Sequence, residues 1–231
     1  MKTIYLSHGD KGGTGKSFVA NTIGSFFEMN KQPFLLIESD ANENGGQPDV
    51  GPRFELSEYA QVASAPISGA GSSRDLIAQL FELIDSTDVE HIVINTPAGA
   101  SDVLEDVGEL LGMACKELGF RLVIFYSLFK TEVAIKQAEK VMHGKLAKYA
   151  HEIYLVKNRF FGTAKISKAL NSYPVFEFDV IHENVMRLIK EDESLAEALI
   201  RLPVLQRIQL NQFFEALKRQ DIEIVLQLLE A

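Results

Sequence analysis

Short apolar runs of four to six residues recur along the chain, and segments with apolar residues at helical spacing separate them. The runs predict buried strands at 2–7, 33–37, 91–95, 121–126 and 153–156. The intervening periodicity predicts helices at 17–29, 74–83, 102–118 and 132–149. Strands that alternate with crossover helices are typical of an α/β fold, with a mostly parallel central sheet and helices on both faces.

Three loops of distinctive composition follow three of these strands. The first is glycine-rich and covers 11–17, the second covers 40–52, and the third follows Asn95. Ligands of parallel sheets bind at the carboxyl ends of the strands, so all three loops are expected at one binding edge. Neither a linker nor a repeat divides the chain, and residues 1–231 are therefore expected to form one domain.

The first loop reads Lys-Gly-Gly-Thr-Gly-Lys-Ser from Lys11 to Ser17 and predicts a phosphate-binding P-loop. Its glycines, Gly12, Gly13 and Gly15, let the backbone aim N–H groups at phosphate oxygens at a helix N-terminus. Lys16 is expected to reach the β- and γ-phosphates, and the Ser17 hydroxyl to coordinate Mg²⁺. The predicted contacts to the nucleotide, most simply ATP, also include Thr14 and Phe18.

The loop resembles the deviant Walker A motif of the ParA/MinD family of dimeric ATPases, P-loop NTPases of the SIMIBI type. Lys11 stands where that motif has a second lysine, and Asp10 replaces the usual first glycine of a P-loop. Four further segments resemble elements of the family. FLLIESD at 34–40 resembles its second strand with switch I, and IVINTPAG at 92–99 resembles its Walker B strand with switch II. LVKNR at 155–159 resembles its late strand near the base, and 174–190 its terminal strand with a returning helix.

The resemblance implies a role for each matching residue. Lys11 would reach across a homodimer to the partner's phosphates, Lys16 and Ser17 would hold the γ-phosphate and Mg²⁺, Asp40 would orient the attacking water beside the metal, and Asn158 would lie beside the adenine. Lys11, Lys16 and Asp40 are thus the expected catalytic residues. Simpler interpretations are a solvated loop lysine for Lys11, a helix or loop cap for Asp40 and a turn residue for Asn158.

Asn95 departs from the family, which usually has an aspartate that accepts from a Mg²⁺-bound water. The asparagine keeps an acceptor oxygen but loses the charge, so we expect slow hydrolysis. Glu38 is expected either near the Mg²⁺ or in a hydrogen bond to the P-loop. An ATP-hydrolysing switch and a nucleotide-gated binding scaffold with little turnover both remain open. A small-molecule kinase or ligase on the same fold is a weaker alternative, because Lys11 and the loop after Asp40 argue against it.

Composition narrows the branch of the family. Cys115 is the single cysteine, which excludes an internal disulfide and the clustered cysteines of iron–sulfur carriers. No apolar run is long enough to cross a bilayer, and the apolar strand at the N-terminus leaves no room for a signal peptide, so we expect a cytoplasmic protein.

The charge distribution singles out one segment. The net charge is −9, yet residues 130–168 are locally basic and include Lys136 and Lys140, one helical turn apart. The segment is either a solvated face or a contact to DNA or to a DNA-bound partner.

The C-terminal region 206–231 has apolar residues at helical spacing but mixed to acidic charge, which disfavours an anionic membrane surface. We expect helices at 205–230 that pack on the domain or on a dimer partner. The opening of the chain most resembles the short plasmid-encoded ATPases of conjugation and mobilisation (StbB-, MobD- and TraL-like proteins), which suggests a role in plasmid partition or transfer.

Overall fold

The computed structural model describes residues 1–39, 49–67, 72–162 and 164–228, and every structural statement below concerns this part of the chain. The strands are β1 Thr3–His8, β2 Phe34–Glu38, β3 Ala60–Ser64, β4 His91–Asn95, β5 Arg121–Leu128, β6 Glu152–Asn158 and β7 Val175–Phe178. The α-helices are α1 Lys16–Met29, α2 Ser73–Asp85, α3 Ala100–Glu117, α4 Glu132–Met142, α5 Lys145–Tyr149, α6 Glu183–Met186, α7 Leu195–Arg201, α8 Val204–Lys218 and α9 Ile222–Val225. Short 3₁₀ turns occupy Gly51–Phe54 (η1), Arg159–Phe161 (η2) and Lys168–Leu170 (η3).

The strands form one sheet in the order β3-β2-β4-β1-β5-β6-β7, and every neighbouring pair is parallel. The expectation of a mostly parallel α/β sheet is confirmed. The carboxyl ends of β2, β4, β1 and β5 therefore meet at the centre of one sheet edge, and the loops that follow them converge there.

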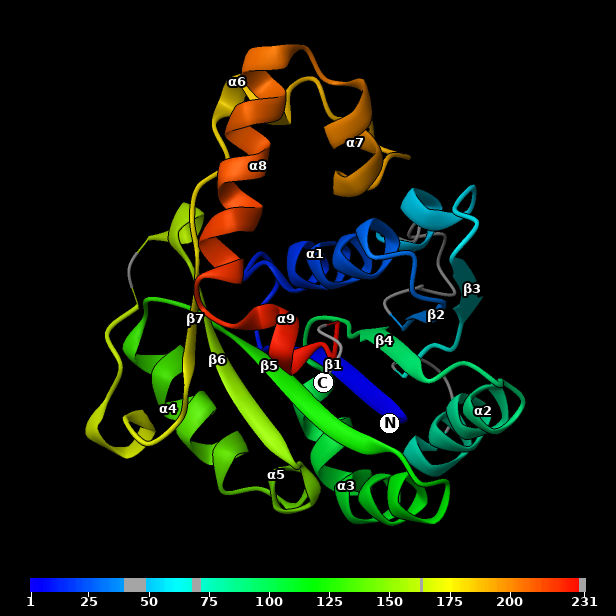
Figure 1. Cartoon of the computed structure of the whole chain (residues 1–231). Coiled ribbons are helices and arrows are strands. Elements are labelled where there is room, and N and C mark those ends of the chain that lie inside the picture. The colour runs from blue at the N-terminus through cyan, green and yellow to red at the C-terminus, as the bar shows by residue number, and fades with distance from the viewer. Residues whose placement is uncertain (40–48, 68–71, 163, 229–231) are drawn as a thin grey trace.

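Helices cover both faces of the sheet (Figure 1), and each face has its own apolar core. On one face α1 packs with the C-terminal helices around Tyr5, Leu36, Val93 and Phe125. On the other face α2, α3, α4 and α5 cover the side chains that alternate with these, such as Leu6 and Ile94. A parallel sheet covered on both faces requires such near-continuous apolar strands, as the sequence shows.

One predicted helix differs from the structure, and one strand of the structure was not predicted. The single helix expected at 132–149 is wrong, because α4 ends at Met142 and α5 begins at Lys145 after Gly144. Both carboxylate oxygens of Glu105 accept from the Lys145 amide N–H, at 3.0 and 2.8 Å, which fixes the start of the second helix. The edge strand β3 was not anticipated, because its residues are only half-buried or exposed and show no apolar run.

The C-terminal helices lie on the α1 face of the sheet (Figure 1). Leu210, Phe213, Phe214 and Leu217 of α8 are buried there, as their helical spacing indicated. Within the described ranges, none of the helices combines the length and the apolar character that a bilayer crossing would require.

Candidate functional site

The loop between β1 and α1 has the backbone shape that its glycines predict. Gly13 and Gly15 adopt left-handed conformations, with φ of 71° and 95°. The carbonyl oxygen of Lys11 accepts from Thr14 Oγ1 and from Lys16 Nζ, both at 3.1 Å, so the loop closes on itself. The backbone of Lys11 is thus held from two sides, while its side chain is only half-buried.

The first turn of α1 is anchored to the sheet beneath it. Ser7 Oγ, at the end of β1, donates to the carbonyl oxygen of Lys16 at 2.8 Å. This bond fixes the N-terminus of α1 over the carboxyl edge of the central strands. Lys16 is buried and Ser17 half-buried at this N-terminus, where the helix dipole favours an anion.

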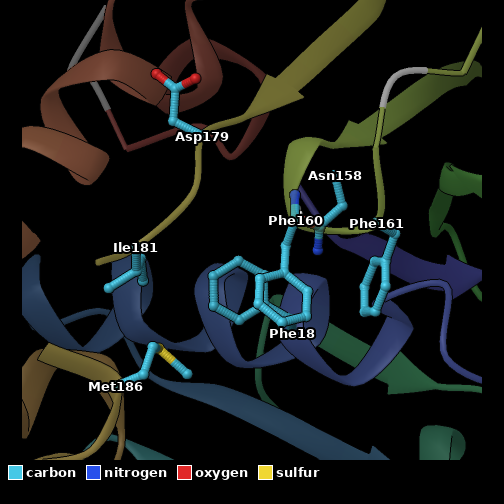
Figure 2. A pocket seen from close by; sticks show the side chains of 7 residues that line it. All are labelled: Phe18, Asn158, Phe160, Phe161, Asp179, Ile181 and Met186. Carbon is cyan, nitrogen blue, oxygen red and sulfur yellow. Dashed lines mark hydrogen bonds between the residues drawn. The ribbon is translucent and has the colours of Figure 1, made fainter. Parts of the chain in front are cut away.

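A mostly apolar pocket of about 190 Å³ opens beside the loop, between the ends of β6 and β7 (Figure 2). It is lined by Phe18, Asn158, Phe160, Phe161, Asp179, Ile181 and Met186. Phe18 packs from behind on Phe213, with ring centroids 5.4 Å apart, which holds its ring in the pocket wall. Aromatic walls with a few polar groups suit a flat heterocycle such as a nucleobase.

Asn158 lies between this pocket and the loop from Lys11 to Ser17, which we call the phosphate loop after its predicted ligand. Its Oδ1 accepts from the Phe160 amide N–H at 3.1 Å, so it does cap the turn that follows β6. Its Nδ2 lies over Gly15, so closely that a Cβ on that glycine would approach it to 2.6 Å. Asn158 therefore serves the turn and also lies between the phosphate loop and the expected base position.

At the other side of the loop, Asn95 pairs with Glu38. Asn95 Nδ2 donates to Glu38 Oε1 at 2.8 Å, and the Val50 amide N–H donates to Glu38 Oε2 at 3.0 Å. Both side chains are buried. Asp40 lies outside the described residues.

The segment after β4 is tied to the phosphate loop. Thr96 Oγ1 donates to the carbonyl oxygen of Ser7 at 2.8 Å, and the Gly99 amide N–H donates to the carbonyl oxygen of Asp10 at 3.0 Å. His8 lies between these ties, with Nδ1 3.5 Å from Thr96 Oγ1 and its ring edge-on to Tyr126. The region expected to act as switch II is therefore hydrogen-bonded to the segment that leads into the phosphate loop.

Burial, and secondarily the positive charge of Lys16, lowers the pKa of His8 to about 3. The imidazole is thus neutral at physiological pH and adds no positive charge beneath the phosphate loop. Burial also raises the pKa of the Cys115 thiol to about 12, which is typical of an inert core cysteine.

The structure brings together Lys11, Gly12, Gly13, Thr14, Gly15, Lys16, Ser17, Phe18, Asn95 and Asn158 around one edge of the sheet. Sequence reasoning missed His8 and most of the pocket wall. Two signals were present: Phe160 and Phe161 lie two and three residues after Asn158, and Asp179 directly follows β7 at the same sheet edge.

No protein-family model matches the chain. The protein MobD from Acidithiobacillus ferrooxidans is 28% identical over 164 residues, which make up 71% of this chain. The match spans 66% of MobD, slightly less than two thirds of that relative's length.

Solved structures match over the whole sheet. The septum site-determining protein MinD from Pyrococcus horikoshii, complexed with Mg-ADP, has a TM-score of 0.59 at 17% identity, and each chain is covered completely. This chain adopts the MinD-type P-loop fold. A chain of the MinC:MinD cell division protein complex from Aquifex aeolicus has a TM-score of 0.54 at 12% identity, with 96% of this chain and 97% of that one covered. The resemblance to ParA/MinD-type ATPases near MobD is confirmed, and the MinD-type fold places the phosphate loop on β1, at the centre of the sheet.

Proposed function

We propose that this protein is a slow, ATP-dependent molecular switch that dimerises across its nucleotide site and positions plasmid DNA or the machinery of partition or conjugative transfer. The observation that carries the proposal is the closed loop from Lys11 to Ser17 at the N-terminus of α1, beside an apolar pocket joined to it by Asn158. The solved MinD from P. horikoshii, of the same fold, is complexed with Mg-ADP.

The residues at the site fit a nucleotide with a divalent cation. Ser17 supplies a hydroxyl at the helix N-terminus, and Asn95 keeps a buried oxygen with no hydrogen-bond partner in the described structure. When bound, Mg²⁺ would neutralise phosphate charge and help align the γ-phosphate. Lys16 would turn from the Lys11 carbonyl towards the phosphates, and Asp40 would orient the attacking water.

Lys11 gives the proposal its dimeric character. A fixed backbone and a half-buried side chain at the rim of the loop suit a cation that acts on phosphates bound by a second copy. Nucleotide binding would then be coupled to dimerisation, because each nucleotide would be held by Lys16 of one subunit and by Lys11 of the other.

Two substitutions test the nucleotide site and the dimer separately. Lys16→Ala is expected to weaken ATP binding at least 100-fold in equilibrium titrations, because a charge-assisted contact to phosphate is lost. Lys11→Ala is expected to bind ATP within about threefold of the native protein but to remain monomeric in light scattering. Lys31→Ala, at an exposed lysine after α1, is the matched control. Absence of Mg·ATP binding by the native protein, or unchanged dimerisation of Lys11→Ala, would overturn the proposal.

Asn95 favours a second candidate, a nucleotide-gated scaffold with little or no hydrolysis. The neutral amide is buried where the family usually has a carboxylate. Steady-state phosphate release from the native protein decides between the two. ATP-dependent dimerisation without turnover above the Lys16→Ala background would support the scaffold.

The segment 130–168 is the proposed contact to DNA or to a DNA-bound partner. Lys130, Lys136 and Lys165 line one surface hollow beside α4, and Lys136 and Lys140 line the next one along the same helix. Glu132 and Glu139 line the first hollow as well, so the charge is mixed at short range. Several lysines on one helix face and its flanking loop would suit phosphate contacts along a duplex.

Charge reversal tests this contact. Lys136→Glu with Lys140→Glu is expected to abolish ATP-dependent DNA binding, because two favourable phosphate contacts become repulsive. The conservative pair Lys136→Gln with Lys140→Gln is expected to reduce the slope of log affinity against log salt by about two. Lys31→Glu with Lys116→Glu, at two exposed lysines outside this segment, makes the same change in net charge and serves as the control. Native-like binding by the double Glu variant would exclude this surface.

A further inference from the structure

Three polar side chains form a row across the ends of neighbouring strands. The strand register pairs Glu38 with Asn95, and Asn95 with Ser7. Residues two positions earlier, such as Leu36 and Val93, belong to the core on the α1 face, so the three polar side chains lie on that face too. The Ser7 bond to Lys16 places the row beneath the first turn of α1. The row therefore faces the N-terminus where phosphates and a cation are expected.

The contacts of Glu38 fix the orientation of the Asn95 amide. A carboxylate can only accept, so Asn95 must present its Nδ2 to Glu38, and the distance of 2.8 Å shows that it does. The second Glu38 oxygen is held by the Val50 amide N–H. Asn95 Oδ1 is consequently turned away from Glu38, and it is buried with no partner in the described part of the chain. Leaving a buried acceptor without a donor is unfavourable, which is reason to expect a ligand there.

The pair as a whole carries the negative charge that Asn95 alone lacks. Glu38 is 1% exposed and Asn95 is 0% exposed, so little water screens the interaction between them. A hydrogen bond from the amide to a carboxylate polarises the amide and makes its oxygen a stronger acceptor. A metal-bound water is a strong donor that matches such an oxygen.

We propose that Glu38 and Asn95 act as one acceptor pair towards the Mg²⁺ of a bound nucleotide, with Glu38 as the positioning residue. Asn95 Oδ1 accepts from a water on the ion, and Glu38 holds the amide in that orientation and supplies the charge from the adjacent strand. The inference rests on the proposed nucleotide-binding function and deepens it. It also implies that aspartate at position 95 is no simple repair, because two buried carboxylates would then lie within hydrogen-bond distance of each other.

Hydrogen-bond geometry predicts what each substitution does. In Glu38→Gln, the new amide oxygen must take the place of Oε2 to accept from the Val50 N–H, so the new NH₂ group faces Asn95. Asn95 must then accept with its Oδ1, which turns its Nδ2 towards the expected metal. Asn95→Asp sets two carboxylates against each other. In the double variant, the glutamine at position 38 accepts from Val50 and donates to the aspartate at position 95, so one bond and one negative charge are restored with donor and acceptor exchanged.

The test compares these three variants with the native protein in two measurements. The first is the Mg²⁺ concentration that gives half-maximal binding of a ribose-labelled fluorescent ADP. Glu38→Gln is expected to raise it about 10–100-fold, as loss of a group that orients a metal ligand does, and the double variant to return within about threefold of native. The second is the unfolding temperature without nucleotide or metal. Asn95→Asp is expected to lower it by about 5 °C or more, and the double variant to recover most of the loss.

Glu117→Gln, at an exposed glutamate of α3, is the control for loss of one carboxylate. Native-like Mg²⁺ dependence in Glu38→Gln, or a double variant no better than the single ones, would overturn the pairing while leaving nucleotide binding intact. Failure of the native protein to bind labelled ADP at any Mg²⁺ concentration would overturn the proposed function and, with it, this role of Glu38.

Discussion

His8 is expected to make the stability of the protein depend on pH in a direction that the structure defines. The ring is 1% exposed and its pKa is lowered to about 3, whereas an imidazole in the unfolded chain has its ordinary value of 6.5. Below pH 6.5 the unfolded chain therefore takes up a proton that the folded chain refuses. The contribution of neutral His8 to the free energy of unfolding is complete above about pH 6.5 and is lost progressively as the pH falls to about 3.

The size of the effect follows from the two pKa values. Each pKa unit corresponds to about 1.4 kcal/mol, so the full loss approaches about 5 kcal/mol near pH 3. Between pH 8 and pH 5 the loss is about 2 kcal/mol. That is a large part of the stability of an ordinary domain.

The assay is urea unfolding of the native protein and of His8→Gln at pH 8, 6 and 5. Carboxylates also titrate in this range, but they contribute equally to both proteins and cancel in the difference. The native protein is expected to lose about 2 kcal/mol more than His8→Gln between pH 8 and pH 5. His182→Gln is the matched control, because His182 is exposed and its ring is hydrated in the folded and the unfolded chain alike. Parallel pH profiles for the native protein and His8→Gln would refute the reasoning.

Three further substitutions or reactions test the packing. Gly24→Ala puts a Cβ 2.7 Å from the Phe54 ring. Although alanine favours the helix by about 1 kcal/mol, thermal unfolding should show a net loss of about 1–2 kcal/mol in the free energy of unfolding. A stabilised variant would show that the ring moves aside. Arg201→Ala removes two hydrogen bonds of 2.6 Å to Glu193, a residue that is 6% exposed. Because that carboxylate then lacks two of its donors, the midpoint of urea unfolding should fall. An unchanged midpoint would mean that solvent replaces the guanidinium. The Cys115 thiol should react with a thiol reagent at pH 8 only in denaturant, since burial raises its pKa to about 12; rapid reaction of the folded protein would contradict this.

The sequence predicted best those elements whose signal is local. β4 has the predicted bounds, and α1 begins within one residue of its prediction. A continuous apolar run and a P-loop motif are each recognisable from neighbouring residues alone. The break at Gly144 was not foreseen, since it depends on Glu105, a residue of another helix. Among the described strands, β3 pairs with β2 alone, and this edge position requires no apolar run.

At the site, the residues of the loop were predictable but their partners were not. The loop residues follow from one contiguous motif. The bond between Glu38 and Asn95 depends on the register of two strands that lie 57 residues apart in the chain. Sequence reasoning left Glu38 either near the metal or bonded to the P-loop, and the structure bonds it to Asn95 and Val50. Its role towards the metal stays a prediction.

The central place of β1 in the sheet has a consequence for synthesis of the protein. β1 leaves the ribosome before the other strands that the structure describes, but its sheet neighbours are β4 and β5, and the partner of Thr3 in β4 is His91. At about 5–20 residues per second, the nascent chain spends roughly 4–18 seconds before that partner is made. Throughout that time Ile4, Tyr5 and Leu6 are apolar residues without their sheet. The loop that follows β1 is thus made well before the two strands that flank β1 in the sheet, and the incomplete chain exposes apolar residues that a chaperone can bind.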